Sequence, residues 1–544
     1  MAMSWISNKF KSVVDAIEKI DNKIPRNDSD NEGDNDNDNS SGNGNNNESK
    51  YKKSNIAENQ LSLEAKKMIY DAVSPYTQTP HGCISDFMVN LYGTGSHSQC
   101  FVNKEAVDIF HNPINTLKFK SMASGCGVLS VNEFDTQYMY RLVSLVRNLR
   151  RFSYPFGKHM LCSIDQRYDY SGEALPNLTG YYVPNDYLFD IVNDYKDLFT
   201  PCISIHPYRK DCVDELIKYA VLGVRYVVWS PISMGINPSS ELCDDFYETL
   251  IQNDMILFIH TGDEHVLVDA PESDNKWGNP LLLRRPLNLG VKIVAVHSGG
   301  EGKSQDIDEK YPHPLVPNIN LFLRIMHEPR YTNNLVGDIS GIVAHGRVDS
   351  IIPLLDHQNI HNRLINGSDY PLPAVNTSVL TILLAKNGLI TSEERDIVNE
   401  IYNYNPILFD FVLKRILRSP SGKQFCLSIF RTNSFFDLKD KSNILFDSGK
   451  SSPLKSMPSS STGSTSSSNW NELSPQPTSP DFNSTLSNNN NNNSNNFNID
   501  DVHNDDTFFD EELNNSMNND GEFKDVIENG YNHEHPSLEE YSLQ

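Results

Sequence analysis

The sequence predicts an α/β protein: one (β/α)8 TIM barrel over residues of roughly 57 to 435, flanked by disordered N- and C-terminal tails. Between the tails, short β-rich runs alternate with longer helical patterns, and eight such runs can be found. This central segment of about 380 residues also carries almost all of the Val, Ile, Leu and Phe, and its length suits one large barrel.

Each expected strand is a short apolar run that ends next to polar or turn-forming residues. The runs are Cys83 to Val89, His159 to Ile164, Thr200 to His206, Val224 to Trp229, Met255 to His260, Val291 to His297, Leu335 to Ile339 and Arg363 to Asn366. Helical patterns follow most of them, at Asp186 to Leu198, Cys212 to Ala220, Glu241 to Asn253, Asn279 to Leu289 and Arg347 to Asp356. Strands separated by helices form parallel sheets. No Gly-rich phosphate-binding turn follows an early strand, which disfavours an open nucleotide-binding sheet.

The two tails differ from the centre in composition. Asp28 to Lys50 is nearly all Asn, Asp, Ser, Gly and Glu, and the same bias returns from about Asp447 to Gln544 with added Pro and Thr. Such segments cannot bury enough apolar surface to offset the entropy of the chain. We therefore expect residues 25–56 and 436–544 to be disordered, and the tails are possible sites for protein partners.

Residues 1–24 form a candidate amphipathic helix, because apolar side chains recur there at helical spacing. These are Ile6, Phe10, Val13, Ile17, Ile20 and Ile24. The helix could dock on the barrel, bind a partner or lie on a membrane surface. Asp15, Glu18 and Asp21 dilute its basic face, which favours docking on the barrel or on a partner.

Composition limits the partners and the cellular compartment that we expect for this protein. The formal charge of -25 disfavours nucleic acid as a partner. The eight cysteines include no CxxC pair, which fits a reduced compartment. No run approaches the length of a transmembrane helix, and the first residues lack the apolar segment of a secretory signal. We expect a soluble cytoplasmic protein that acts on a small molecule.

Three expected strands end in residues that bind metals. The fifth ends in His260, the sixth in His297, and the eighth is followed by Asp369. In a barrel of this type the carboxyl ends of the strands meet at one mouth, so two imidazoles and a carboxylate would converge there. This set suits a zinc-like divalent ion. Singly each residue is a weak signal, and we expect His206, which precedes Pro207, to be structural.

The central region resembles the amidohydrolase-related family, metal-dependent hydrolases of TIM-barrel fold that include decarboxylases. The resemblance is carried by Cys83-Ile-Ser-Asp86, Tyr182-Val-Pro-Asn-Asp-Tyr, Ser204-Ile-His-Pro-Tyr-Arg209, Met234-Gly-Ile-Asn-Pro238, His260-Thr-Gly-Asp-Glu264, Gly278 to Arg285, His297 and Asp369-Tyr-Pro. It implies that His260 binds metal, that His297 binds metal or stabilises the transition state, and that Asp369 is both ligand and proton acceptor.

The sequence departs from this family at the first strand. There the family has an Asp-x-His-x-His signature, and this chain reads Asp86-Phe-Met88-Val-Asn90. Val228 stands before Trp229 where relatives often carry a Lys, which excludes a carboxylated-Lys bridge between two metals at that position. His260, His297 and Asp369 could still hold one metal ion. Two imidazoles and one carboxylate suit zinc best.

In such a site Asn90 or a water molecule would fill a further coordination place. His81 and His97 flank the altered signature and are weaker candidates for the missing ligands.

Two functions therefore remain open. The favoured one is a mononuclear hydrolase of an amide, ester or lactone-like bond, in which Asp369 accepts the proton of metal-bound water and His297 steadies the oxyanion. The alternative is a catalytically inactive barrel that binds a ligand or a protein. We expect Arg284 and Arg285 to be surface or structural charges, and Glu301 to Val316 to be a loop over the mouth.

Overall fold

The computed structural model describes the central part of the chain. The described residues are 60–77, 84–104, 107–108, 110, 112–151, 156–264 and 271–431. The helix predicted for residues 1–24 and the disorder predicted for 25–56 and 436–544 lie outside these ranges and stay predictions.

Eight parallel strands form the centre of the fold, and each overlaps one of the eight predicted runs. They are β1 (Ile84–Asn90), β3 (Phe156–Cys162), β5 (Phe199–Cys202), β6 (Tyr226–Trp229), β7 (Ile256–His260), β8 (Lys292–Val296), β11 (Leu335–Asp338) and β12 (Leu364–Ile365). Hydrogen bonds order them as β1-β3-β5 and as β12-β11-β8-β7-β6. Neighbours in space are therefore neighbours along the chain.

Backbone bridges join these two groups of strands into a closed barrel. On one side Ile203, directly after β5, pairs in parallel with Val227 of β6. On the other side the chain after β12 runs beside β1, where the Asp369 N–H donates to the Met88 carbonyl at 2.8 Å. The predicted (β/α)8 barrel is confirmed by this strand order and its closure.

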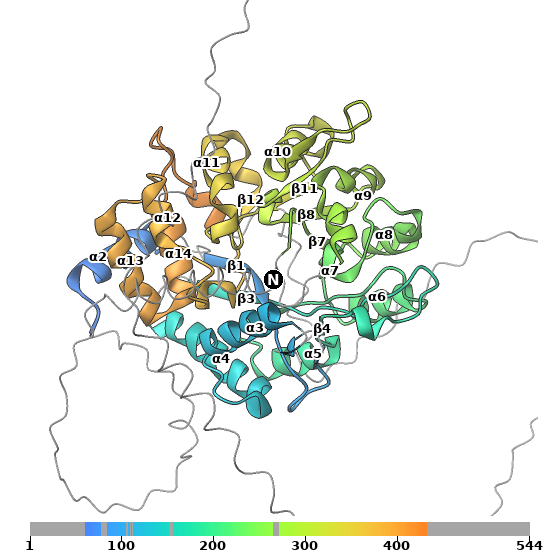
Figure 1. Cartoon of the computed structure of the whole chain (residues 1–544), viewed down its shortest axis with the longest axis horizontal. Coiled ribbons are helices and arrows are strands. Elements are labelled where there is room, and N and C mark those ends of the chain that lie inside the picture. The colour runs from blue at the N-terminus through green and yellow to red at the C-terminus, as the bar shows by residue number, and fades with distance from the viewer. Residues whose placement is uncertain are drawn as a thin grey trace, which may run out of the picture. The chain divides into compact units, whose positions relative to one another are not determined.

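Helices surround the strands (Figure 1). They are α2 (Leu63–Val73), α3 (Pro113–Gly125), α4 (Phe134–Arg151), α5 (Asn185–Asp194), α6 (Cys212–Val221), α7 (Pro231–Met234), α8 (Asp244–Gln252), α9 (Arg284–Leu289), α10 (Asn318–Met326), α11 (Val348–Asp356), α12 (Thr381–Lys386), α13 (Ser392–Tyr404) and α14 (Pro406–Ile416). Two small antiparallel pairs are formed by β2 (Phe101–Val102) with β4 (Tyr181–Tyr182), and by β9 (Lys303–Gln305) with β10 (Leu315–Pro317).

Local sequence signals fix several helix ends. Helix α13 begins with a capping box, in which Thr391 and Glu394 satisfy each other's backbone N–H groups. Asn405 caps α14 through its side chain, and Pro406 takes the first helical position, where a missing N–H costs nothing. These signals let two helices follow each other with one residue between them.

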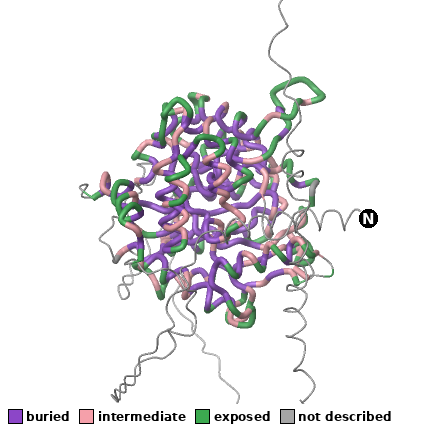
Figure 2. Tube along the Cα trace, turned by 60° about the vertical axis from the view of Figure 1, so that its left-hand side comes forward, coloured by how far each residue is buried: buried purple, intermediate pink, exposed green. Residues whose placement is uncertain are grey.

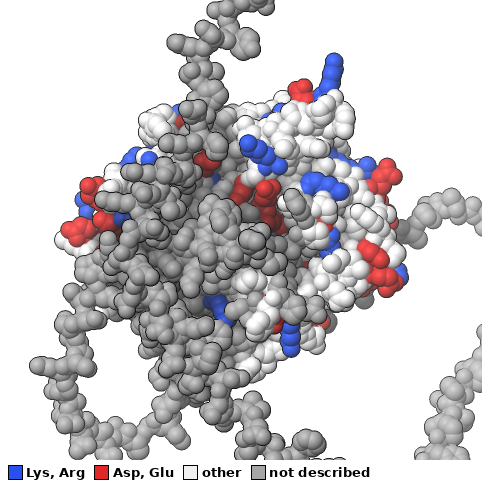
Figure 3. All heavy atoms as spheres, in the orientation of Figure 1, with Lys and Arg blue, Asp and Glu red and all other residues white. Residues whose placement is uncertain are grey.

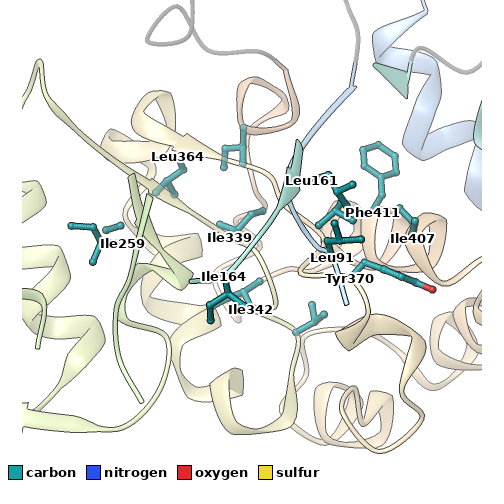
Figure 4. Close-up of a cluster of buried hydrophobic side chains, with 14 of the residues drawn as sticks. Leu91, Leu161, Ile164, Ile259, Ile339, Ile342, Leu364, Tyr370, Ile407 and Phe411 are labelled. Carbon is teal, nitrogen blue, oxygen red and sulfur yellow. The ribbon is translucent and has the colours of Figure 1, made fainter. Parts of the chain in front are cut away.

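Apolar side chains fill the barrel in two layers. The outer layer lies between strands and helices, where Leu161 and Leu364 from strands and Phe411 from α14 are drawn in Figure 4. The inner layer fills the inside of the barrel and consists of Phe87, Met88, Met160, Cys162, Cys202, Val228, Ile256, Phe258, Val294, Val296, Val336 and Ile365. Figure 2 shows these buried regions at the centre and exposed residues at the periphery. The inside of the barrel is therefore packed, not open.

The loop expected over the mouth, Glu301 to Val316, contains the β9–β10 hairpin. Arg324 of α10 anchors it, donating to Asp306 at 2.6 Å and to Asp308 at 2.9 Å. Arg284 also donates to Asp308, and Arg285 donates to Asp244. The structural role expected of both arginines is confirmed by these ion pairs.

The surface of the described part carries both signs of charge. In Figure 3, acidic and basic side chains are interspersed where the face is not covered by grey atoms. No helix among the described residues is long and apolar enough to cross a membrane.

A buried ion pair connects α14 to the barrel. The Lys414 ammonium donates to Asp410 and to the Gly367 carbonyl, both at 2.7 Å, and its side chain is 0% exposed. Burial raises the pKa of Asp410 to about 7, although Lys414 opposes the shift. The pair holds the segment between β12 and Asp369 against the helix.

We expect Lys414→Met to lower the free energy of unfolding by about 3 to 5 kcal/mol, because it leaves the Asp410 carboxylate buried without its countercharge. Urea denaturation followed by circular dichroism at slightly alkaline pH measures this. The double variant Lys414→Met/Asp410→Asn should recover most of the loss. A single variant as stable as the parent would contradict the structural role of this pair.

Candidate functional site

A cavity of about 460 Å³ opens at the mouth of the barrel. His260, His297 and Asp369 all line it, so the structure brings the three sequence-predicted site residues together. His260 is the last residue of β7, His297 follows β8, and Asp369 follows β12. Their meeting follows from the strand order, because β7, β8 and β12 belong to one group of parallel strands and their carboxyl ends lie on one rim.

The three side chains are close enough to act on one small molecule. The rings of His260 and His297 lie edge to face, with centroids 4.8 Å apart. His297 Nε2 lies 3.8 Å from Asp369 Oδ2. Both residues have left-handed backbone conformations, with φ of 64° at His297 and 58° at Asp369. Residues other than glycine rarely adopt this conformation, and it concentrates at functional sites.

His297 is held rigidly and is neutral. Its backbone N–H donates to Asp338 Oδ1 at 2.6 Å, and its Nδ1 lies 2.9 Å from the Ser340 carbonyl. A carbonyl only accepts, so the tautomer with its proton on Nδ1 satisfies this contact and leaves a lone pair on Nε2, while Arg347 Nη1 lies 3.3 Å from the same Nδ1. Burial and then the charge of Arg347 hold the pKa of His297 well below its usual value.

His260 has the opposite charge preference. Its Nδ1 lies 3.4 Å from Glu264 Oε1, and the other oxygen of Glu264 accepts hydrogen bonds from Ser230 and Ser233. Burial lowers the pKa of His260, but the hydrogen bond and charge of Glu264 outweigh it and raise the pKa above its usual value. For Glu264, burial is likewise outweighed by His260, and its pKa is lowered.

Asp369 is engaged through both oxygens. Its Oδ1 accepts from the Asn90 amide nitrogen at 2.9 Å, and its Oδ2 accepts from Arg347 Nη1 at 3.4 Å. Arg347 also donates to the Gly341 carbonyl at 3.2 Å and is buried. The carboxylate is thus already neutralised by a cation of the chain itself.

The donor set for a divalent ion is incomplete. Met88, at the first histidine position of the family signature, is buried in the inner layer, with its Sδ 3.7 Å from Cys162 Sγ. Asn90, at the second, directs its amide nitrogen to Asp369. Among the described residues, no group of three or more His, Cys, Asp or Glu side chains could hold a metal ion. The arrangement therefore does not fit the zinc ion that the sequence led us to expect.

The walls of the cavity are largely apolar. Leu117 and Met122 of α3 form one side, and Tyr92 and Tyr181, with ring centroids 4.9 Å apart, stack at another. Val375 adds to the wall from the chain after β12. Apolar walls with a few converging polar groups are typical of sites for small organic molecules. Of the loop expected over the mouth, Glu301 is the residue that lines the cavity.

Other sequence-predicted histidines lie apart from the site. His206 is 0% exposed and bonds through both ring nitrogens, to the Met234 carbonyl and the Tyr208 N–H, as expected of a structural residue. His97 is exposed and does not line the cavity. His81 lies outside the described residues.

Sequence reasoning missed two charged residues of the site, Glu264 and Arg347. Glu264 lies four residues after His260, at the end of the His-Thr-Gly-Asp-Glu segment. The sequence shows that spacing, but Glu264 lies in a loop after the strand, where no regular secondary structure predicts the direction of its carboxylate. Arg347 precedes α11, and a charge at the start of a helix gave no signal that it would reach Asp369 across the mouth.

Comparisons with known proteins find similar barrels at low identity. One is an uncharacterised TIM-barrel protein of Bordetella bronchiseptica, 14% identical over 59% of this chain and 97% of its own, with a TM-score of 0.35. A second is a probable 2-pyrone-4,6-dicarboxylic acid hydrolase of Acinetobacter baumannii, which is 11% identical over 58% of this chain and 94% of its own, with a TM-score of 0.32.

A third is a manganese-bound 5-carboxyvanillate decarboxylase of Novosphingobium aromaticivorans, which is 15% identical over 59% of this chain and 96% of its own, with a TM-score of 0.30. The sequence matches no protein-family model and no curated protein. The assignment of the fold rests on the strand order of this chain itself.

We expect Glu264→Gln to lower the pKa of His260, because it removes the contribution that most opposes burial and leaves only the weaker effects of Asp369 and Asp338. Proton and carbon NMR of histidine-labelled protein, titrated over pH, measures this. Glu301→Gln is the matched control: it removes another carboxylate that lines the cavity and leaves the Glu264 contact intact. An unchanged His260 pKa in Glu264→Gln would show that the two side chains do not interact in solution.

Proposed function

We propose that the mouth of the barrel binds a small molecule and hydrolyses an amide, ester or lactone-like bond in it. The observation that carries this proposal is the meeting of His260, His297 and Asp369 in one cavity with apolar walls. Polar groups with perturbed pKa values that converge in one cavity are a common mark of functional sites. The fold alone does not select the reaction.

The opposite pKa shifts of the two histidines suggest their roles. His260, beside Glu264, favours its protonated form and can give a proton to the leaving group. His297 favours its neutral form, and its Nε2 lone pair can orient a water molecule. A pair of neighbouring groups whose environments separate their pKa values is a common arrangement for acid and base catalysis.

Asp369 completes the set as the proton acceptor. The attacking water would lose its proton to the Asp369 carboxylate as its oxygen bonds to the carbonyl carbon. The bond to the leaving group would then break as His260 supplies a proton to it. Asp369 lies 3.8 Å from His297 Nε2, so one water can contact both groups. The products are a carboxylic acid and an amine or alcohol.

A zinc ion held by His260, His297 and Asp369 is not part of this proposal. It would have to displace Arg347 and Asn90 from Asp369. Zinc would activate water if it were bound there, so metal content belongs in the test of function.

The second candidate function is a barrel without catalysis that binds a small molecule or a protein. The specific observation in its favour is the loss of both first-strand histidines, replaced by buried Met88 and by Asn90. Such a barrel would keep the cavity and lose the chemistry.

The decisive measurement is hydrolysis by the full chain of a panel of small esters, lactones and amides that fit the cavity. We expect Asp369→Asn to reduce kcat/KM by about 100-fold or more, the usual effect of losing a general base. Asp349→Asn, which changes an exposed carboxylate on α11, should keep the parent rate. A parent that binds panel compounds by calorimetry but hydrolyses none would contradict the enzyme and leave the binding barrel.

A further inference from the structure

Arg347 places a permanent positive charge beside Asp369 and His297, two of the three residues expected to hold a metal ion. Its Nη1 lies 3.4 Å from Asp369 Oδ2, 3.3 Å from His297 Nδ1 and 3.2 Å from the Gly341 carbonyl. A divalent ion bound to Asp369 would sit about 2 Å from the same carboxylate. Both cations would then lie against Asp369, and burial makes their repulsion strong, although Glu301 Oε2 also lies 3.9 Å from Arg347 Nε.

The backbone is shaped to admit this guanidinium. Gly341 has a φ of +58°, and a Cβ atom there would lie 2.2 Å from Arg347 Nη1 and 2.6 Å from Asp369 Oδ2. A side chain at this position would require the ends of Arg347 and Asp369 to shift. The approach of the two side chains is therefore built into the chain after β11, and Arg347 itself is 7% exposed.

The missing ligands support the same conclusion independently. Met88 presents a thioether to the inner layer, and the Asn90 amide nitrogen donates to the carboxylate oxygen that Arg347 does not contact. Both oxygens of Asp369 thus accept from N–H groups of the chain. A hydrogen-bonded carboxylate with a permanent countercharge has little affinity left for a metal.

We infer that the Arg347 guanidinium replaces the metal ion in this barrel. The site binds and polarises a carbonyl or carboxylate oxygen of its ligand with an organic cation and takes up no divalent metal. Within the described residues, Nη2 of Arg347 makes no hydrogen bond, and Arg347 lines the cavity, so a ligand oxygen can accept from this group. Its part in hydrolysis, stabilising the negative oxygen of the intermediate, rests on the proposed function.

Zinc retention by the full chain tests the replacement without an activity assay. The protein is stripped with chelator, incubated with excess zinc, passed through a desalting column and measured by mass spectrometry of metals. We expect the parent to retain clearly less than one zinc per chain. Zinc at one per chain that is lost in His260→Ala/Asp369→Asn would overturn the inference, and this arm does not depend on the folding of any Arg347 variant.

Variants of Arg347 test whether its guanidinium is the reason that the parent retains little zinc. Arg347→Gln should bind zinc about 10- to 100-fold more tightly than the parent, the range by which groups around metal ligands change affinity. Arg347→Lys keeps the charge and should bind as weakly as the parent. Circular dichroism establishes that each variant is folded. Equal zinc affinity of parent and folded Arg347→Gln would show that the guanidinium does not exclude the metal.

The hydrolysis panel separates the failure of this inference from the failure of the proposed function. Activity that survives chelator in the parent and falls in Arg347→Gln would support both. Activity that chelator abolishes and zinc restores would overturn the metal-free site and keep the hydrolase. If no compound is hydrolysed, the proposed function fails, and zinc retention still decides whether Arg347 has replaced the metal.

Discussion

The hydrogen bonds that close the barrel determine the rest of this structure. Where the chain after β12 meets β1, the Asp369 N–H donates to the Met88 carbonyl at 2.8 Å. This pairing sets Asp369 beside Asn90, so the altered first strand and the last site residue share one edge of the mouth. A barrel that did not close here would separate the carboxylate from Asn90 of β1, because β12 is joined to β7 and β8 on its other side through β11.

Charged side chains of the protein itself neutralise one another at the mouth of the barrel. Glu264 stabilises a protonated His260, and Arg347 donates to Asp369 while it disfavours a charged His297. His260 and Asp369 each have an oppositely charged partner within ion-pair distance, as buried charges require. A metal-dependent barrel uses its ion for the same purpose. The first-strand changes at Met88 and Asn90 and the position of Arg347 are thus parts of one arrangement.

Much of the fold could be predicted from the sequence, because parallel strands are continuous apolar runs and helices between them are amphipathic. All eight predicted strands correspond to strands of the barrel, although boundaries differ by a few residues, as at β3, which begins at Phe156 and not at His159. The convergence of His260, His297 and Asp369 was also predictable, since each ends a strand. Their roles remain proposals.

By itself the sequence determined the barrel, the rim on which the site lies, and the presence of Met88 and Asn90 in the first strand. Only the tertiary structure decided which side chains surround Asp369. Arg347 lies 22 residues before Asp369 and 50 after His297, and its contact with both depends on the turn at Gly341 and on the order of β8, β11 and β12 in the sheet. Side-chain direction at the end of a loop follows from long-range packing, which periodicity and spacing along the chain do not encode.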